Sequence, residues 1–379
     1  MSSSTETLRR TRFVLISDTH NHTPALPRGD VLIHAGDLTN QGSYSEASAG
    51  RLSRVVQWLE KADFESKIVV AGNHDLNLDP ELVASRGSSL ADSSHTHQDC
   101  LDLLISSPSI TYLAHASTTI RLSSPEGPHT TFRAFGSPFS PLSSLHGSFS
   151  AFTYASPLHP LTPTTAADLP SLWDAIPLDA DVVITHTPPR AHGDESPARR
   201  SAGCEALRRA LWRVRPRLAA CGHVHEARGA ERVLWDLSCG NVAFKETSVE
   251  QWVDPAPEGK KLSILSLGSR GGNPLRNDGG RGTWAERDDA VTQSATATMQ
   301  SGVPGGAMPH IGTRGLGGDP SSARSDGEAL AGRLGRLETC VVNCAIMAKS
   351  YPHVGGRKTN KPIVVDLDLP VWCESRHGF

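Results

Sequence analysis

The amino-acid sequence predicts an α/β fold whose first part is a largely parallel sheet. Three observations indicate this: short apolar runs near the N-terminus, a helical pattern between two of them, and further apolar runs later in the chain. Strand, crossover helix and strand in this order are typical of βαβ units, in which the strands lie parallel.

The first half of the chain supplies three strands and one helix. The predicted strands are the apolar runs at residues 13–16, 31–34 and 67–70. A helix between the second and third runs is predicted from apolar residues at i, i+3, i+4 and i+7, which form one buried stripe: Leu52, Val55, Val56 and Leu59.

The second half is less regular. Residues 137–169 are rich in Ser, Pro and Thr and predict loop. Further strands are predicted at residues 181–184, 218–221, 233–235, 237–242 and 361–369. Apolar spacing predicts one helix over residues 204–214 and a second helical stripe from Leu337 to Met347.

Composition changes sharply between about residues 255 and 334, where Gly, Ser and Arg dominate without periodicity. A stretch of this length without pattern predicts a flexible segment. We therefore expect one domain made of residues 11–252 and 336–373, interrupted by a flexible insertion at 253–335 and preceded by a disordered segment at 1–10.

The overall composition limits the classes of function. The 379-residue chain has a formal net charge of −3, which gives no reason to expect nucleic-acid or membrane binding through bulk electrostatics. Its seven cysteines are scattered without a CxxC pair, and the first residues lack an apolar signal region. No apolar run is long enough to span a membrane. We expect a cytoplasmic protein, with nuclear residence left open.

Five short polar motifs follow apolar runs. They are Asp18-Thr-His20, Gly36-Asp37, Gly72-Asn73-His74-Asp75, Thr185-His186 and Gly222-His223-Val-His225. The carboxyl ends of strands form the binding crevice of an open α/β sheet, so these side chains are expected to meet there. Imidazole and carboxylate ligands with one amide and no thiolate suit Mn²⁺, Fe²⁺/Fe³⁺ or Zn²⁺. Asp37 has no i+2 partner, and its natural role is a carboxylate shared by two ions.

The motifs DxH, GD, GNH[DE], H and GHxH occur in this order in the calcineurin-like metallophosphoesterase superfamily, which the chain resembles over about residues 13–242. A narrower resemblance is to the metallophosphoesterase-domain-containing branch, which is seen in animals and widely in fungi. Four segments carry it: Asp30–Asp37, Phe135–Phe139, Ile184–Pro189 and Asn360–Asp366.

The resemblance implies a β-sandwich of two mixed sheets flanked by helices, with the active site on loops at one sheet edge. It also implies two divalent ions, Mn²⁺ first and Fe, Zn or Mg as alternatives. One ion would be held by Asp18, His20 and His225, the other by Asn73, His186 and His223, with Asp37 bridging.

Three further residues receive roles from the resemblance. His74 would protonate the leaving oxygen or stabilise the transition state. Asp75 would orient a histidine as its hydrogen-bond partner. His192 corresponds to a position at the rim of the cleft and is a candidate substrate contact.

The function implied is hydrolysis of small phosphodiesters or phosphomonoesters, nucleotide-like ones in particular, by a hydroxide that bridges the two ions. The alternative is a nucleotide-binding or scaffold protein with weak or vestigial phosphodiesterase activity. Residues 36–42 lack the second Asp and the Arg of the GDxxDRG motif of protein Ser/Thr phosphatases. The expected partner is a small phosphoester or nucleotide, with no membrane and no nucleic acid, while the oligomeric state stays open.

Overall fold

The computed structural model describes most of the chain. The described residues are 7–42, 50–85, 91–142, 150–154, 172–195, 201–236, 246–257, 259–271, 273–277, 336–349, 356 and 358–372. Within α4, the side chains of residues 91–96 are not described.

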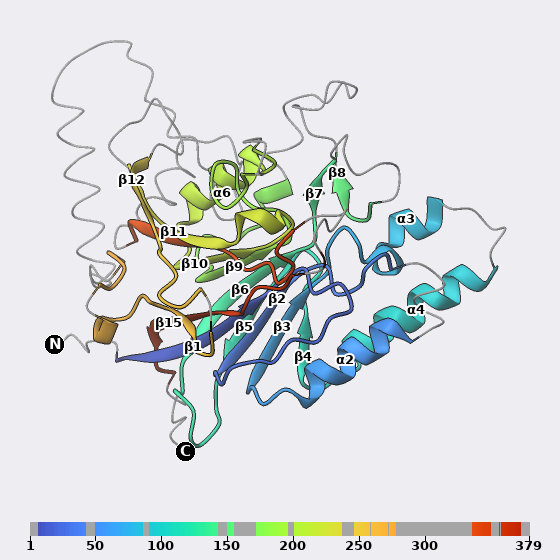
Figure 1. Cartoon of the computed structure of the whole chain (residues 1–379), viewed down its shortest axis with the longest axis horizontal. Helices are drawn as coiled ribbons and strands as arrows, with labels where there is room; N and C mark the ends of the chain where they lie inside the picture. The colour runs from blue at the N-terminus through green and yellow to red at the C-terminus, as the bar shows by residue number, and fades with distance from the viewer. Residues whose placement is uncertain are drawn as a thin grey trace, which may run out of the picture.

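Two mixed sheets form the centre of the molecule (Figure 1). The first sheet has the order β13 (Ser263–Ser266), β15 (Ile363–Pro370), β1 (Leu8–Ile16), β2 (Val31–Ala35), β3 (Ser66–Val70) and β4 (Ile110–Tyr112). Strands β1 to β4 run parallel, whereas β15 pairs with β1 in the antiparallel sense. The parallel start of the sheet, predicted from the sequence, is confirmed.

The second sheet has the order β12 (Glu246–Gln251), β11 (Gly229–Trp235), β14 (Glu338–Asn343), β10 (Leu218–Cys221), β9 (Val182–Thr185), β6 (Thr131–Ser137) and β5 (Ala116–Arg121). Its centre is parallel, from β14 through β10 and β9 to β6. The outer strands β5, β11 and β12 run antiparallel to their neighbours. Two short strands, β7 (Ser140–Pro141) and β8 (Thr153–Tyr154), pair separately.

The helices cover the outer faces of the sheets (Figure 1). They are α2 (Arg51–Lys61), α3 (Pro80–Ser85), α4 (Ala91–Ile105) and α6 (Glu205–Val214), with 3₁₀ turns η1 (Leu76–Leu78), η2 (His225–Ala227) and η3 (Ser269–Gly271). None of the helices in the described part of the chain is both long and apolar enough to cross a membrane.

The apolar core has three layers. Between the sheets, side chains such as Phe13 and Ile33 from the first meet Phe132 and Ala220 from the second. Outside the first sheet, the predicted stripe of α2 packs with α4 against β1 to β3. Outside the second sheet, α6 packs through Leu207 and its neighbours. The β-sandwich of two mixed sheets flanked by helices is therefore confirmed.

The predicted helical stripe between Leu337 and Met347 is wrong, because this segment forms strand β14. Every residue from Glu338 to Asn343 is buried, since β14 lies inside the second sheet with both of its faces covered. An apolar run buried on both faces carries no alternation. Its helical spacing is therefore a coincidence.

The boundaries predicted for the flexible segments also need correction. Strand β13 falls inside the expected 253–335 insertion, yet it pairs in parallel with β15. Leu265, Leu267 and Leu275 join the core between the sheets. Strand β1 begins at Leu8, within the segment expected to be disordered. The remaining residues 1–6 and 278–335, and the predicted strand at 237–242, lie outside the described residues.

Candidate metal centre

The polar motifs meet where the parallel strands of both sheets end. Asp18 follows β1, Asp37 follows β2 and Asn73 follows β3, while His186 and His223 follow β9 and β10. Backbone φ angles are positive at three of these residues, with 51° at Asp18, 56° at Asp37 and 69° at His223. Such conformations are uncommon for residues with a Cβ, and they cluster at functional sites.

A first group of side chains gathers around Asp18 and His225. Their closest atoms, Oδ1 and Nε2, lie 3.3 Å apart, and His225 Nε2 lies 3.2 Å from His20 Nε2. One ligand atom from each of Asp18, His20, Asp37 and His225 lies within 4.8 Å of all the others, and all four residues are buried. Two imidazoles and two carboxylates that converge in this way are a donor set suited to a divalent cation.

A second group lies on the other side of Asp37. The Oδ1 atom of Asn73 lies 2.9 Å from His186 Nε2 and 2.9 Å from His223 Nδ1. Asp37 turns Oδ1 toward His186 Nε2, at 3.4 Å, and Oδ2 toward His20 Nε2, at 3.7 Å. The structure thus brings all seven predicted ligands together, with the two oxygens of Asp37 divided between the groups.

The charges of the centre depend on one another. Burial opposes ionisation of Asp18, but the hydrogen bond and charge of His225 hold the pKa of this carboxyl below its usual value. Burial likewise disfavours a charged His225, yet the bond to Asp18 raises the pKa of the imidazole to about 9. Burial dominates at His20 and lowers its pKa to about 4. The buried carboxylates are therefore ionised and attract cations.

His74 lies beside the centre without joining either group. Its Nδ1–H donates to the Asn40 carbonyl at 2.6 Å, and its backbone N–H donates to Asp37 Oδ1 at 2.8 Å. The ring stands edge-on to His20 with centroids 4.9 Å apart. Because Nδ1 is held by a carbonyl, Nε2 is the nitrogen that can exchange a proton.

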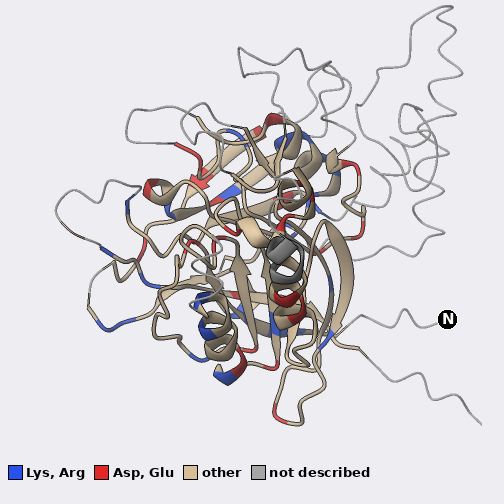
Figure 2. Ribbon diagram, turned by 90° about the vertical axis from the view of Figure 1, so that its right-hand side faces the viewer, with Lys and Arg blue, Asp and Glu red and all other residues tan. Residues whose placement is uncertain are grey.

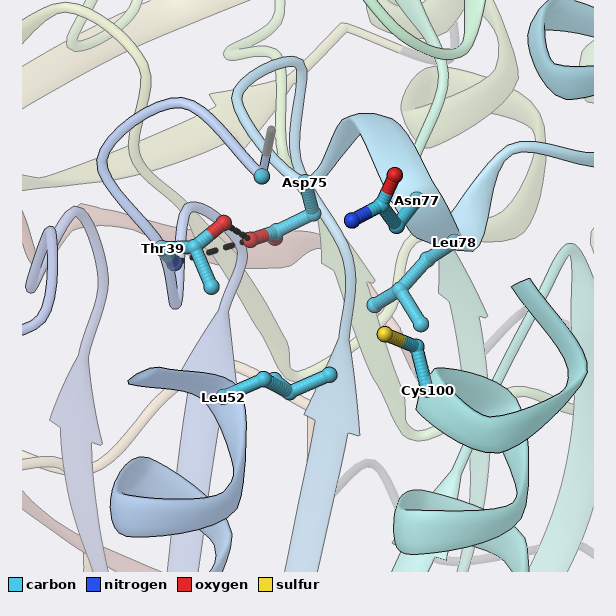
Figure 3. A pocket seen from close by; sticks show the side chains of 7 residues that line it. Thr39, Leu52, Asp75, Asn77, Leu78 and Cys100 are labelled. Atoms are coloured by element: carbon cyan, nitrogen blue, oxygen red, sulfur yellow. Dashed lines mark hydrogen bonds between the residues drawn. The ribbon is translucent and has the colours of Figure 1, made fainter. Parts of the chain in front are cut away.

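Asp75 binds backbone groups and a hydroxyl, and no histidine is among its hydrogen-bond partners in the part of the chain that the structure describes, which corrects the role predicted for it. Its carboxylate accepts from the N–H groups of Leu38, Thr39 and Gly72 and from the Thr39 hydroxyl, at 2.7–3.2 Å. Figure 3 shows its hydrogen bonds to Thr39 beside a small cavity that is also lined by Leu52, Leu78 and Cys100. Burial and the nearby carboxylate of Asp37 raise the pKa of Asp75 to about 6. Asp75 thus joins the loop that carries Asp37 to the loop that carries Asn73.

His192 is buried away from solvent, with an exposed fraction of 1%. Its Nδ1 lies 2.7 Å from Glu231 and its Nε2 lies 2.9 Å from Glu246, so both ring nitrogens already have carboxylate partners. Arg208 binds Glu246 from α6. These contacts leave no nitrogen of His192 for a substrate, which argues against the predicted contact. The ion pairs of His192 with Glu231 and Glu246 join the loop after β9 to strands β11 and β12.

Sequence reasoning missed the last residue of β14 and the residues that follow this strand. The backbone of Ser17 and Asp18 exchanges hydrogen bonds with Cys344, Ile346 and Met347. Asn343, the last residue of β14, is buried beside the loop of His223. A polar residue at the carboxyl end of a strand was the available signal, but the segment was predicted to be helical.

Comparison with known proteins agrees with this geometry. The family model described as "Calcineurin-like phosphoesterase" matches residues 11–227. The chain belongs to the calcineurin-like phosphoesterase family. Within this family, it is 34% identical over 230 residues to human metallophosphoesterase domain-containing protein 1, covering 58% of this chain and 62% of that protein. The narrower resemblance found in the sequence is therefore confirmed.

Two further relatives extend the comparison. A UPF0046 protein of Caenorhabditis elegans is 34% identical over 235 residues, covering 62% of this chain and 68% of that protein. A protein of Emericella nidulans named "Probable rhamnogalacturonate lyase C" is 38% identical over 228 residues, which is 60% of this chain but only 18% of that protein. The chain thus spans less than two thirds of the fungal and human relatives, and the lyase name describes a much longer protein.

Proposed function

We propose that the protein is a metal-dependent phosphoric ester hydrolase with a dinuclear centre. The observation that carries this proposal is the position of Asp37 between two ligand groups, with one carboxylate oxygen turned toward each. Three other ligands stand on each side. Asp18, His20 and His225 would hold one ion, and Asn73, His186 and His223 the other.

Divalent ions, when bound there, supply Lewis-acid activation of a water molecule and of the phosphoryl oxygens. The ligand set fits Mn²⁺, with Fe, Zn or Mg as alternatives. The protein's own contribution is to hold these side chains at fixed positions before the ions arrive. Burial of all the carboxylates in the centre strengthens their attraction for cations.

His74 is the proposed proton donor to the leaving oxygen. Its Nδ1–H donates to the Asn40 carbonyl, which leaves Nε2 as the ring nitrogen available to the leaving oxygen. Edge-on packing against His20 keeps the ring next to the ligands. His74 is only half-buried, which allows a substrate oxygen to approach it.

The substrate we propose is a small phosphodiester or phosphomonoester, nucleotide-like in particular. Lys and Arg are interspersed with Asp and Glu along the described ribbon (Figure 2), and the formal net charge of −3 offers no bulk attraction for nucleic acid. The alternative is a nucleotide-binding or scaffold protein with vestigial activity. Cytoplasmic residence and the absence of a membrane or nucleic-acid partner stay predictions.

The proposal is tested by metal analysis and an aryl-phosphodiester assay with added Mn²⁺. We expect two ions per chain in the wild type, loss of activity in Asp37→Ala and His186→Ala, and retained metal with most turnover lost in His74→Ala.

His129→Asn is a matched control. His129 lies between β5 and β6, at the end of the second sheet that is opposite to the ligands. Its φ of 55° is tolerated by Asn. Full turnover in Asp37→Ala would contradict the mechanism. Tight nucleotide binding without turnover in the wild type would favour the scaffold alternative.

A further inference from the structure

Asn343 lies where the ligand loops of the second sheet come together. It ends β14, whose parallel neighbour β10 places Cys221 beside it, one residue before the Gly222-His223-Val224-His225 loop. Its side chain is buried, with an exposed fraction of 1%. An amide buried at this place must find its partners within the protein, because an unsatisfied polar group there is destabilising.

The Asn343 amide contacts both loops that carry histidine ligands. Its Nδ2 donates to the carbonyl of Gly193 at 2.8 Å, in the loop that follows His186. The same nitrogen donates to the carbonyl of Val224 at 2.8 Å and lies 3.4 Å from that of Gly222. Val224 stands between the ligands His223 and His225, so this bond acts on the backbone that aims both rings.

The other end of the amide binds the segment that follows β14. Asn343 Oδ1 accepts from the Ala345 N–H at 3.1 Å. Ala345 forms a bridge with Ser17, and Met347 N–H donates to the Asp18 carbonyl at 3.3 Å. One side chain therefore links loops from β9 and β10 to the segment that lies against the Asp18 loop.

The backbone around Asn343 leaves little freedom for adjustment. Gly193 has a φ of +59°, and a Cβ added there would lie 3.1 Å from the Asn343 Cβ. A Cβ added at Gly222 would overlap Ser17 Oγ and Asp18 Oδ2. Asn343 thus packs directly against Gly193, and Ser17 and Asp18 pack directly against Gly222, at distances that only glycine permits.

We infer that Asn343 is a positioning residue that holds His186, His223 and His225 in the arrangement required to bind metal. This inference rests on the proposed function and names a further determinant of the same site. Asn343 touches no ligand side chain in its hydrogen bonds, so its effect is transmitted through the backbone carbonyls of the two loops. Removal of a group that hydrogen-bonds to a ligand side chain lowers metal affinity by about 10- to 100-fold, and we expect an effect in this range from a side chain that holds the ligand loops.

The test compares Asn343→Leu with Asn277→Leu. Leu has the same number of side-chain heavy atoms as Asn but makes no hydrogen bonds, so the carbonyls of Gly193 and Val224 and the N–H of Ala345 lose this partner in Asn343→Leu. Asn277 is also buried and also serves β14, but at the other end, where its amide binds the backbone of Leu337 and Glu338. A general loss of stability would therefore be similar in the two variants, while an effect on metal binding would differ.

Mn²⁺ binding is measured by isothermal titration calorimetry on metal-free protein, beside thermal unfolding and the aryl-phosphodiester assay. For Asn343→Leu we expect at least one ion to bind about 10- to 100-fold more weakly, with kcat reduced at saturating Mn²⁺. For Asn277→Leu we expect two ions at wild-type affinity. Gly193→Ala perturbs the same contact from the opposite side and should weaken Mn²⁺ in the same direction, so it decides the outcome if Asn343→Leu does not fold.

Wild-type Mn²⁺ affinity in Asn343→Leu, or in Gly193→Ala where Asn343→Leu does not fold, would overturn the inference and leave the proposed function intact. Equal weakening in Asn343→Leu and Asn277→Leu would also overturn it, because the effect would then be a general one. A wild type that binds no Mn²⁺ would instead refute the proposed function, and the inference with it.

Discussion

The buried ion pairs of His192 give a prediction about pH and stability. Glu231, Glu246 and the Trp235 ring face this imidazole, and Arg208 binds Glu246 from α6. Burial opposes the positive charge, but the two carboxylates raise the pKa of His192 to about 9 from an ordinary 6.5. The folded state therefore binds the proton more tightly than the unfolded state does.

The size of the effect follows from that difference. Each tenfold change in proton affinity is worth about 1.4 kcal/mol, so a rise from 6.5 to about 9 corresponds to about 3 kcal/mol of stability. This contribution is fully present below pH 6.5 and is lost as the pH rises through about 9. The pKa values of Glu231 and Glu246 are lowered despite burial, because both carboxylates bond to His192. The stability that these two carboxylates contribute through their bonds to His192 is lost only as the pH falls and they become protonated.

His192→Gln removes the charge but keeps a side chain that can donate a hydrogen bond. We expect the free energy of unfolding to fall by about 3 kcal/mol at pH 6 and by much less at pH 9.5. Urea denaturation of both proteins at the two pH values measures this difference, and other titrating groups cancel in the comparison. Adding Glu231→Gln should recover part of the loss, with a coupling of about 1–2 kcal/mol.

The reasoning would be refuted by an equal loss of stability at pH 6 and pH 9.5, which would mean that packing, and not charge, makes His192 important. Additive effects of His192→Gln and Glu231→Gln would contradict the ion pair itself.

Three other predictions concern the ligand loops and the bound metal. Asp75→Asn should lower the free energy of unfolding by about 2 kcal/mol and weaken metal binding, because an amide cannot accept all the hydrogen bonds that Asp75 takes from Thr39 and its neighbours. Thermal unfolding of the metal-free protein and titration with Mn²⁺ measure the two effects. Gly222→Ala should bring a methyl group against Asp18, and metal analysis of the purified variant should show fewer than two ions per chain. Chelation with EDTA should lower the unfolding midpoint of the wild type, and Mn²⁺ should restore it; an unchanged midpoint would show that no metal stabilises the fold.

Much of the site could be predicted from the sequence, because each motif follows its own strand. The carboxyl ends of parallel strands in one sheet lie at the same edge, so Asp18 and Asp37, which follow β1 and β2, must approach one another whatever the loops between them do. His186 joins them because β9 of the second sheet ends beside them. Spacing of two residues in Asp18/His20 and His223/His225 added a local constraint.

The main errors have different physical causes. Strand β14 is buried throughout, so its spacing could not distinguish a strand from a helix. Strand β13 is a four-residue run within a polar, glycine-rich region, and it becomes a strand only because β15 offers an edge beside it. His192 was placed at the rim of the cleft from the family resemblance, and its partners, Glu231 and Glu246, could not be recognised because they are distant in sequence.

The sequence by itself determined the family, the ligand types and the strands that present them, because these depend on local order along the chain. Only the tertiary structure decided which oxygen of Asp37 faces which histidine, that Asp75 joins two loops, and that Asn343 spans two more. These contacts join residues far apart in the chain, and their partners are mainly backbone groups, which look alike at every position of a sequence. Because every residue has a backbone carbonyl, the amino-acid type at a position does not reveal that its carbonyl accepts such a hydrogen bond.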